Sequence, residues 1–164
     1  MGMTGQFLRV SNDDLETYFL NSNLLSERMD ASYTGDPEFI DIDKAWEGIL
    51  FLLTGSGIAI DPHHPLAKII MSENVVDEDQ NFGFGPATYV TPEEVIQLSK
   101  ELTTIDRAEL TKRYNPVALN EAEIYPQGWD DEEMLEYVLE NYDTLKQFYA
   151  DAAANGQAIV SIIN

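Results

Sequence analysis

The stretch that most constrains the fold is a two-sided helix predicted from residue 130 to about residue 154. At about 100° per residue, its apolar and acidic side chains fall on opposite sides. The apolar stripe therefore forms part of a core, and the acidic stripe faces water or a partner. The apolar stripe consists of Met134, Val138, Tyr142, Leu145, Tyr149 and Ala152, and the acidic stripe consists of Glu132, Glu136, Glu140 and Asp143.

Strand signals lie at both ends of the sequence, at residues 4–10 and 157–163, with a short one at 87–90. Helical signals fill most of the space between them. Strands and helices in this order favour an α+β fold. We expect one domain over residues 1–164, with a small mixed or antiparallel sheet that includes the N- and C-terminal strands and packs with several helices.

Two helix starts carry capping signals. Thr91 precedes Pro92, and Glu94 stands where a capping box needs an acid. For the C-terminal helix, we predict Asp130 as the N-cap, with Glu133 three residues later. Gly55 suits the end of a buried helix that contains Trp46.

Charge limits the partners of the chain. Thirty acidic residues against nine basic ones give a net charge of −21. Phosphate backbones and anionic membranes attract basic proteins, so neither nucleic acid nor a membrane surface is an expected partner. Solubility explains much of this charge. Lys146, three residues after Asp143, is the one base that we expect to relieve the acidic stripe.

The sequence indicates a cytoplasmic protein. It has no cysteine, which suits a reducing compartment and removes thiolate chemistry. The N-terminal residues lack the basic flank and long apolar run of a signal peptide. The longest apolar run, Ile49–Leu53, is far too short to span a bilayer.

The sequence signals for a metal site are weak, and we expect no metal or other cofactor. Asp77, Asp79 and Asn81 alternate as in a calcium loop, but Thr88 stands where that loop needs a bidentate acid. His63 and His64 are adjacent, so their side chains point apart, and no third ligand beyond Asp61 is in view. A polar loop and a turn are the simpler interpretations.

Several strings resemble the YfbM-like family of uncharacterised bacterial proteins (domain of unknown function 1877). They are DIDKAW (41–46) with FLLTG (51–55), DP (61–62) followed by HPL, TPEEV (91–95) and NEAEIYP (120–126). Members often carry a histidine four residues after the tryptophan, where this chain has Leu50. The resemblance implies a single α+β domain and no particular activity.

Two functions remain open. The first is a non-enzymatic binding module, of inhibitor or immunity type, that engages a basic protein through Glu132, Glu136, Glu140 and Asp143. The alternative is a small-molecule-binding protein or enzyme with a pocket near residues 41–46 and Tyr125. Its candidate pocket residues are Asp41, Asp43, Trp46, Tyr125 and Trp129.

Overall fold

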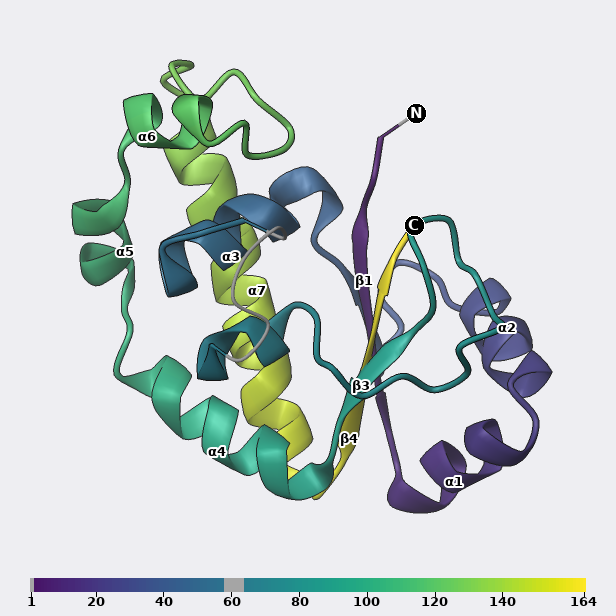
Figure 1. The fold of residues 1–164 in the computed structure, drawn as a ribbon. Helices are drawn as coiled ribbons and strands as arrows, with labels where there is room; N and C mark the ends of the chain where they lie inside the picture. The colour runs from purple at the N-terminus through teal and green to yellow at the C-terminus, as the bar shows by residue number, and fades with distance from the viewer. Residues whose placement is uncertain (1, 58–63) are drawn as a thin grey trace.

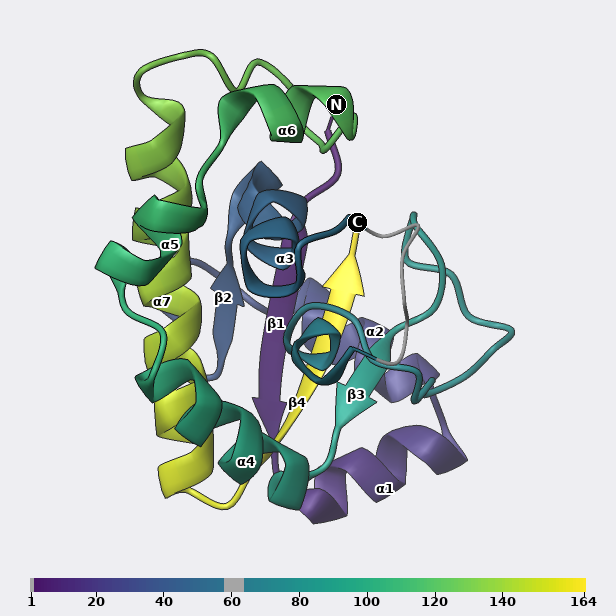
Figure 2. The ribbon, with the colours of Figure 1, turned by 60° about the vertical axis from the view of Figure 1, so that its left-hand side comes forward.

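The computed structural model describes residues 2–57 and 64–164. Within them, four strands form one antiparallel sheet (Figure 1), and Figure 2 shows their order, β2-β1-β4-β3. The strands are β1 (Gly5–Val10), β2 (Phe39–Asp41), β3 (Thr88–Val90) and β4 (Ala158–Ile163). The predicted α+β class is confirmed, and the strands nearest the two ends of the chain pair with each other in the middle of the sheet.

Helices cover both faces of the sheet (Figure 2). One face packs against two short helices, α1 (Asn12–Leu20) and α2 (Asn23–Asp30). The other face packs against a larger group of helices that includes the long C-terminal helix. That group consists of α3 (Trp46–Thr54), α4 (Pro92–Thr103), α5 (Arg107–Arg113), α6 (Pro116–Glu121) and α7 (Met134–Ala154), with 3-10 turns η1 (Asp43–Ala45) and η2 (Pro65–Ile69).

The alternation of side chains along the strands creates two cores. In β1, Phe7 points into the core under α3, α4 and α7, whereas Leu8 points into the core under α1 and α2. Strand β4 behaves in the same way, and all six of its residues are buried. Ser161 of β4 pairs with Phe7 on one side and with Thr88 on the other.

Most predicted helix ends are confirmed. Thr91 accepts a hydrogen bond from the Glu94 amide, and the Glu94 carboxylate accepts one from the Thr91 amide, which completes the capping box. Gly55 ends α3 with a φ of 83°, which glycine adopts without steric cost. The apolar stripe of the last helix is also confirmed, because Val138, Tyr142 and most of its other members are buried.

The predicted start of the last helix is wrong by a few residues. Helix α7 begins at Met134, and Asp130 does not cap it. The Asp130 carboxylate instead accepts a hydrogen bond from Asn120 Nδ2 at 2.8 Å. Asp131 accepts one from the Glu133 amide at 2.9 Å, so the preceding residues form turns before the helix begins.

The sequence alone predicts a strand or extended segment over residues 56–65 and leaves LAKIIM (66–71) open between helix and strand. Most of the first segment, residues 58–63, lies outside the described part of the chain. The LAKIIM segment is helical at its start, where it forms most of η2. Among the described helices, none combines the length and apolar character needed to cross a membrane.

Candidate functional site: the acidic face of helix α7

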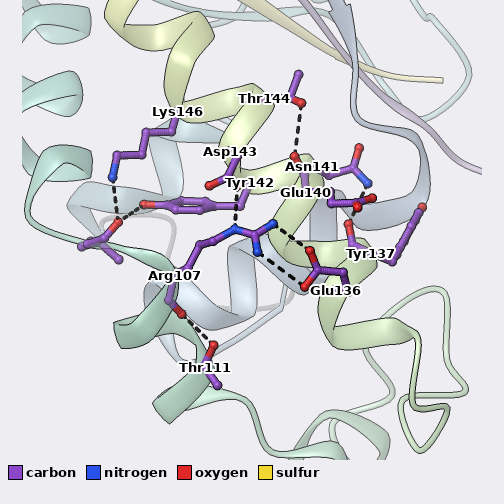
Figure 3. Close-up of polar contacts among 11 residues, drawn as sticks. Arg107, Thr111, Glu136, Tyr137, Glu140, Asn141, Tyr142, Asp143, Thr144 and Lys146 are labelled. Atoms are coloured by element: carbon purple, nitrogen blue, oxygen red, sulfur yellow. Dashed lines mark hydrogen bonds and ion pairs between the residues drawn. The ribbon is translucent and has the colours of Figure 1, made fainter.

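Four carboxylates form the predicted acidic face: Glu132, Glu136, Glu140 and Asp143. All four side chains are exposed, opposite the buried stripe of α7. Glu132 lies in the turn that precedes the helix, and the other three lie on the helix itself. The structure therefore brings this set together on one outward surface, of which Figure 3 shows the part around Arg107.

Arg107 binds two members of the acidic face. Its Nε lies 2.6 Å from Asp143 Oδ2, and its Nη2 lies 3.0 Å from Glu136 Oε1 (Figure 3). The hydrogen bonds that Arg107 donates to the carboxylates of Glu136 and Asp143 raise the pKa of this arginine further above its usual range. The residue comes from the first position of α5, a helix capped by Asp106.

The predicted pairing of Lys146 with the acidic face is wrong. Lys146 does not pair with Asp143; its Nζ donates to the carbonyl oxygen of Ile105 at 3.3 Å. Arg107 takes that role from 36 residues upstream of Asp143. Spacing within one helix predicts pairs three or four residues apart, and it carries no information on a partner from another helix.

Glu132 and Glu140 keep their charges unopposed within the described chain. Neither forms an ion pair with any residue in the ranges 2–57 and 64–164. Four carboxylates against the single guanidinium of Arg107 leave three negative charges on the acidic face. This surface attracts cations, and salt weakens the attraction because the groups are exposed.

A groove of about 540 Å³ runs beside the second half of α7 and is bounded on its other side by residues 35–40. Its walls include the carboxylates of Asp36, Asp143 and Asp151, and its apolar part includes Phe39 and Phe148. The amide of Glu38 and the nearby Arg28, 3.0 Å away, lower the pKa of Asp36 and keep it ionised. Asp36 pairs with Arg28 and Asp143 pairs with Arg107, so Asp151 is the wall carboxylate without an ion pair in the described chain. The groove thus places this negative charge beside apolar contact area, and it shares Asp143 with the acidic face.

The predicted pocket residues Asp41 and Asp43 hold a turn together. Asp41 Oδ1 accepts a hydrogen bond from the Asp43 amide at 2.7 Å. Asp43 Oδ2 accepts one from the Tyr137 hydroxyl, also at 2.7 Å. Burial and the Asp43 carboxylate raise the pKa of Tyr137, so this phenol stays protonated. These contacts join η1 to α7, which is a structural role.

Trp46 and Tyr125 meet around Met3. Trp46 Nε1 donates to the Met3 carbonyl oxygen at 3.2 Å, and the Met3 amide donates to the Tyr125 hydroxyl at 2.9 Å. The centres of the two rings lie 6.0 Å apart. Trp129 does not share this contact with Met3, because its Nε1 donates to the carbonyl oxygen of Ile124 at 2.8 Å. Trp46 and Trp129 are both fully buried, and the small-molecule pocket predicted here stays a prediction.

Two candidate metal ligands, Asp77 and His64, use their side chains to hold turns. Asp77 accepts hydrogen bonds from the Ser22 hydroxyl and from the Asp79 amide. His64 Nδ1 accepts one from the Leu66 amide at 3.1 Å, which caps η2. Residues 2–57 and 64–164 contain no group of three His, Asp or Glu side chains that could hold an ion. Asp61 and His63 lie outside these ranges.

Fold and surface together define a small α+β protein with an acidic helix face beside a groove. The chain belongs to the family described as "Domain of unknown function (DUF1877)", whose model matches residues 1–162. It is similar to Protein YfbM of Escherichia coli (strain K12), with 32% identity over 129 residues, which are 77% of this chain and 74% of that protein.

The fold is also similar to a solved structure, "The Crystal Structure of a Protein of Unknown Function YfbM from Escherichia coli". The two superpose with a TM-score of 0.78 over 98% of this chain and 99% of that one. Identity over the superposed residues is 20%. This similarity shows the fold alone.

Proposed function

We propose that this protein is a non-enzymatic binding module, of inhibitor or immunity type, for a basic protein in the bacterial cytoplasm. The observation that carries the proposal is the acidic face of α7, where Arg107 offsets only part of the charge. The adjoining groove supports it, since a lysine or arginine has an apolar stem and a cationic head. Such a side chain would contact Phe39 and Phe148 through its stem and Asp143 or Asp151 through its head.

Electrostatic attraction would act mainly on the rate of association. A net charge of −21 attracts a basic surface over a distance of about one Debye length, roughly 8–10 Å at physiological salt. Complementary charge raises association rates well above those of neutral partners, and the gain falls as salt rises. The basic partner is thus expected to bind faster in dilute salt, with a smaller effect on its dissociation.

The test compares two variants that each remove two negative charges. Glu132→Gln with Glu140→Gln changes the acidic face and leaves the pairs of Arg107 intact. Glu16→Gln with Glu27→Gln is the control, because these exposed residues lie on α1 and α2, across the sheet. Both proteins and the parent are immobilised, and basic proteins retained from an extract of the source cell are quantified at low and at high salt.

The expected result is a set of basic proteins retained by the parent and by the control, lost from the α7 variant and released by salt. Equal retention by all three proteins would show nonspecific attraction to a polyanion and would overturn the assignment of the acidic face. Retention that does not change with salt would overturn the electrostatic mechanism itself. A partner identified in this way is then purified, and its association rate with each variant is measured.

A further inference from the structure

Ser161 is an anomaly in the middle of the sheet. Strand β4 reads AIVSII, and Ser161 is its one polar side chain, facing the same core as Phe7. The residue is 5% exposed. Its hydroxyl has no hydrogen-bond partner in residues 2–57 and 64–164, and its oxygen is not among the fully buried polar atoms. The hydroxyl is therefore open to the cavity that Ser161 lines, where water or a ligand can pair with it.

The Ser161 side chain lines a cavity of about 290 Å³ at the β3 side of the sheet. Thr88 lies directly across from it on β3, so two hydroxyl-bearing side chains stand next to each other. The rest of the wall is mostly apolar and includes Val75, Phe84 and Ile163. This cavity does not overlap the acidic face or the groove beside α7.

Hydrogen bonds hold the walls in place. The Phe84 amide donates to the Ile163 carbonyl at 3.1 Å, which fixes the loop that carries Phe84 to the end of β4. The Ser72 amide donates to the Thr88 hydroxyl at 3.3 Å, and the Ser72 hydroxyl donates to the Tyr89 carbonyl at 2.5 Å. The space is therefore formed before any ligand arrives, which lowers the entropic cost of binding.

We propose that this cavity binds a small neutral molecule with an apolar body and one hydroxyl-like group, which pairs with Ser161. An apolar cavity of about 150 Å³ holds benzene, so this cavity has room for a substituted ring. The wall favours a neutral molecule. The net charge of −21 and Glu73, an exposed member of the wall, disfavour an anion. The remaining wall is mostly apolar and disfavours any ion that must lose its hydration.

Phenol and benzene are matched probes, because they differ by the one group that Ser161 would bind. Each is titrated into the full chain, and amide chemical shifts are followed by NMR. Phenol should bind about two- to tenfold more tightly than benzene, the range expected for one hydrogen bond. The shifts should centre on Thr88, Phe84 and Ser161. In Ser161→Ala, this preference should disappear while benzene affinity stays unchanged.

A second variant blocks the space. Val75→Phe fills the cavity and should abolish binding of both probes, whereas Val117→Phe, at an exposed site on α6, should leave it intact. Thermal unfolding confirms that each variant is folded. The proposal is overturned if neither probe shifts these amides, which would mean that the cavity holds water only. It is equally overturned if Ser161→Ala keeps the phenol preference, or if Val75→Phe still binds. None of these outcomes depends on a basic protein partner.

Discussion

Arg107 holds Asp143 through a hydrogen bond of 2.6 Å between Nε and Oδ2, across 36 residues of sequence and between two helices. The same guanidinium reaches Glu136, so one cation ties α5 to two positions on α7. All three side chains remain substantially exposed to water. Exposed ion pairs contribute little to stability, and salt screens them.

Removing this cation should therefore increase negative charge with only a small loss of stability. Arg107→Gln should lower the Tm by no more than about 3 °C at low salt and by less at high salt. Lys112→Ala is the control, because Lys112 is more exposed and lies 4.0 Å from its partner Glu109. A larger loss that salt does not reduce would mean that packing of the arginine stem, rather than its charge, joins the two helices. Calorimetry at two salt concentrations distinguishes these cases.

The pH dependence of stability should include a contribution from Glu94. Burial alone would raise its pKa, but the Lys68 ammonium, 3.0 Å away, and the Thr91 amide outweigh this effect and lower it. A depressed pKa in the folded state stabilises the fold above the unfolded pKa of about 4.3, and this contribution is lost as pH falls through the folded value.

Glu94→Gln tests this contribution, since glutamine keeps the capping box but loses the charge. The variant should be about 0.5–1 kcal/mol less stable than the parent at pH 7. Denaturant titrations should show that this gap narrows as pH falls from 7 to below the unfolded pKa of about 4.3, because Glu94 of the parent takes up a proton. A gap of constant size over this pH range would assign the loss to hydrogen-bond geometry rather than to charge.

Gly48 should resist replacement even though it lies inside helix α3. A Cβ added there would overlap the ring of Trp129, which is buried. Alanine normally stabilises a helix by up to about 1 kcal/mol over glycine, but overpacking costs about 1–3 kcal/mol. Gly48→Ala should therefore destabilise the protein in denaturant titrations, whereas Ser99→Ala in α4 should be neutral or stabilising. Unchanged or higher stability in Gly48→Ala would show that the Trp129 ring moves aside at no cost.

The Tyr125 hydroxyl should protect the segment before β1. It accepts the hydrogen bond of the Met3 amide, so Tyr125→Phe leaves that amide without this partner. Exchange of the Met3 amide hydrogen should become about two- to tenfold faster, the effect of one hydrogen bond. Tyr33→Phe, at a residue that is 64% exposed, provides the control. No change in exchange rate would show that the Trp46 contact to Met3 is sufficient.

The sequence was most informative where the physics is local. Thr91 and Glu94 cap a helix three residues apart, and the spacing of Val138, Tyr142 and Leu145 identified the buried side of α7. It failed where side chains had a choice of partners. Asp130 has the right type and spacing for an N-cap, but Asn120 binds its carboxylate instead.

The candidate sites show the same division. Periodicity placed Glu136 and Glu140 on one exposed side, but it could not place Arg107 beside them because that pairing depends on how α5 packs. The cavity beside Ser161 could not be predicted from the sequence. One serine in an apolar strand does not show which face of the sheet it occupies or which residues lie opposite it. Strand alternation becomes a prediction of burial only after the neighbouring elements are known.

The central position of β4 has a consequence for synthesis. Its residues Ala158–Ile163 form the pairing partner of both β1 and β3, so neither strand can complete its hydrogen bonds before they emerge from the ribosome. Contacts this distant along the chain also slow folding. A nascent chain that stops short of β4 would expose two apolar strand edges, which makes it a natural client for chaperones and prone to aggregate when they are scarce.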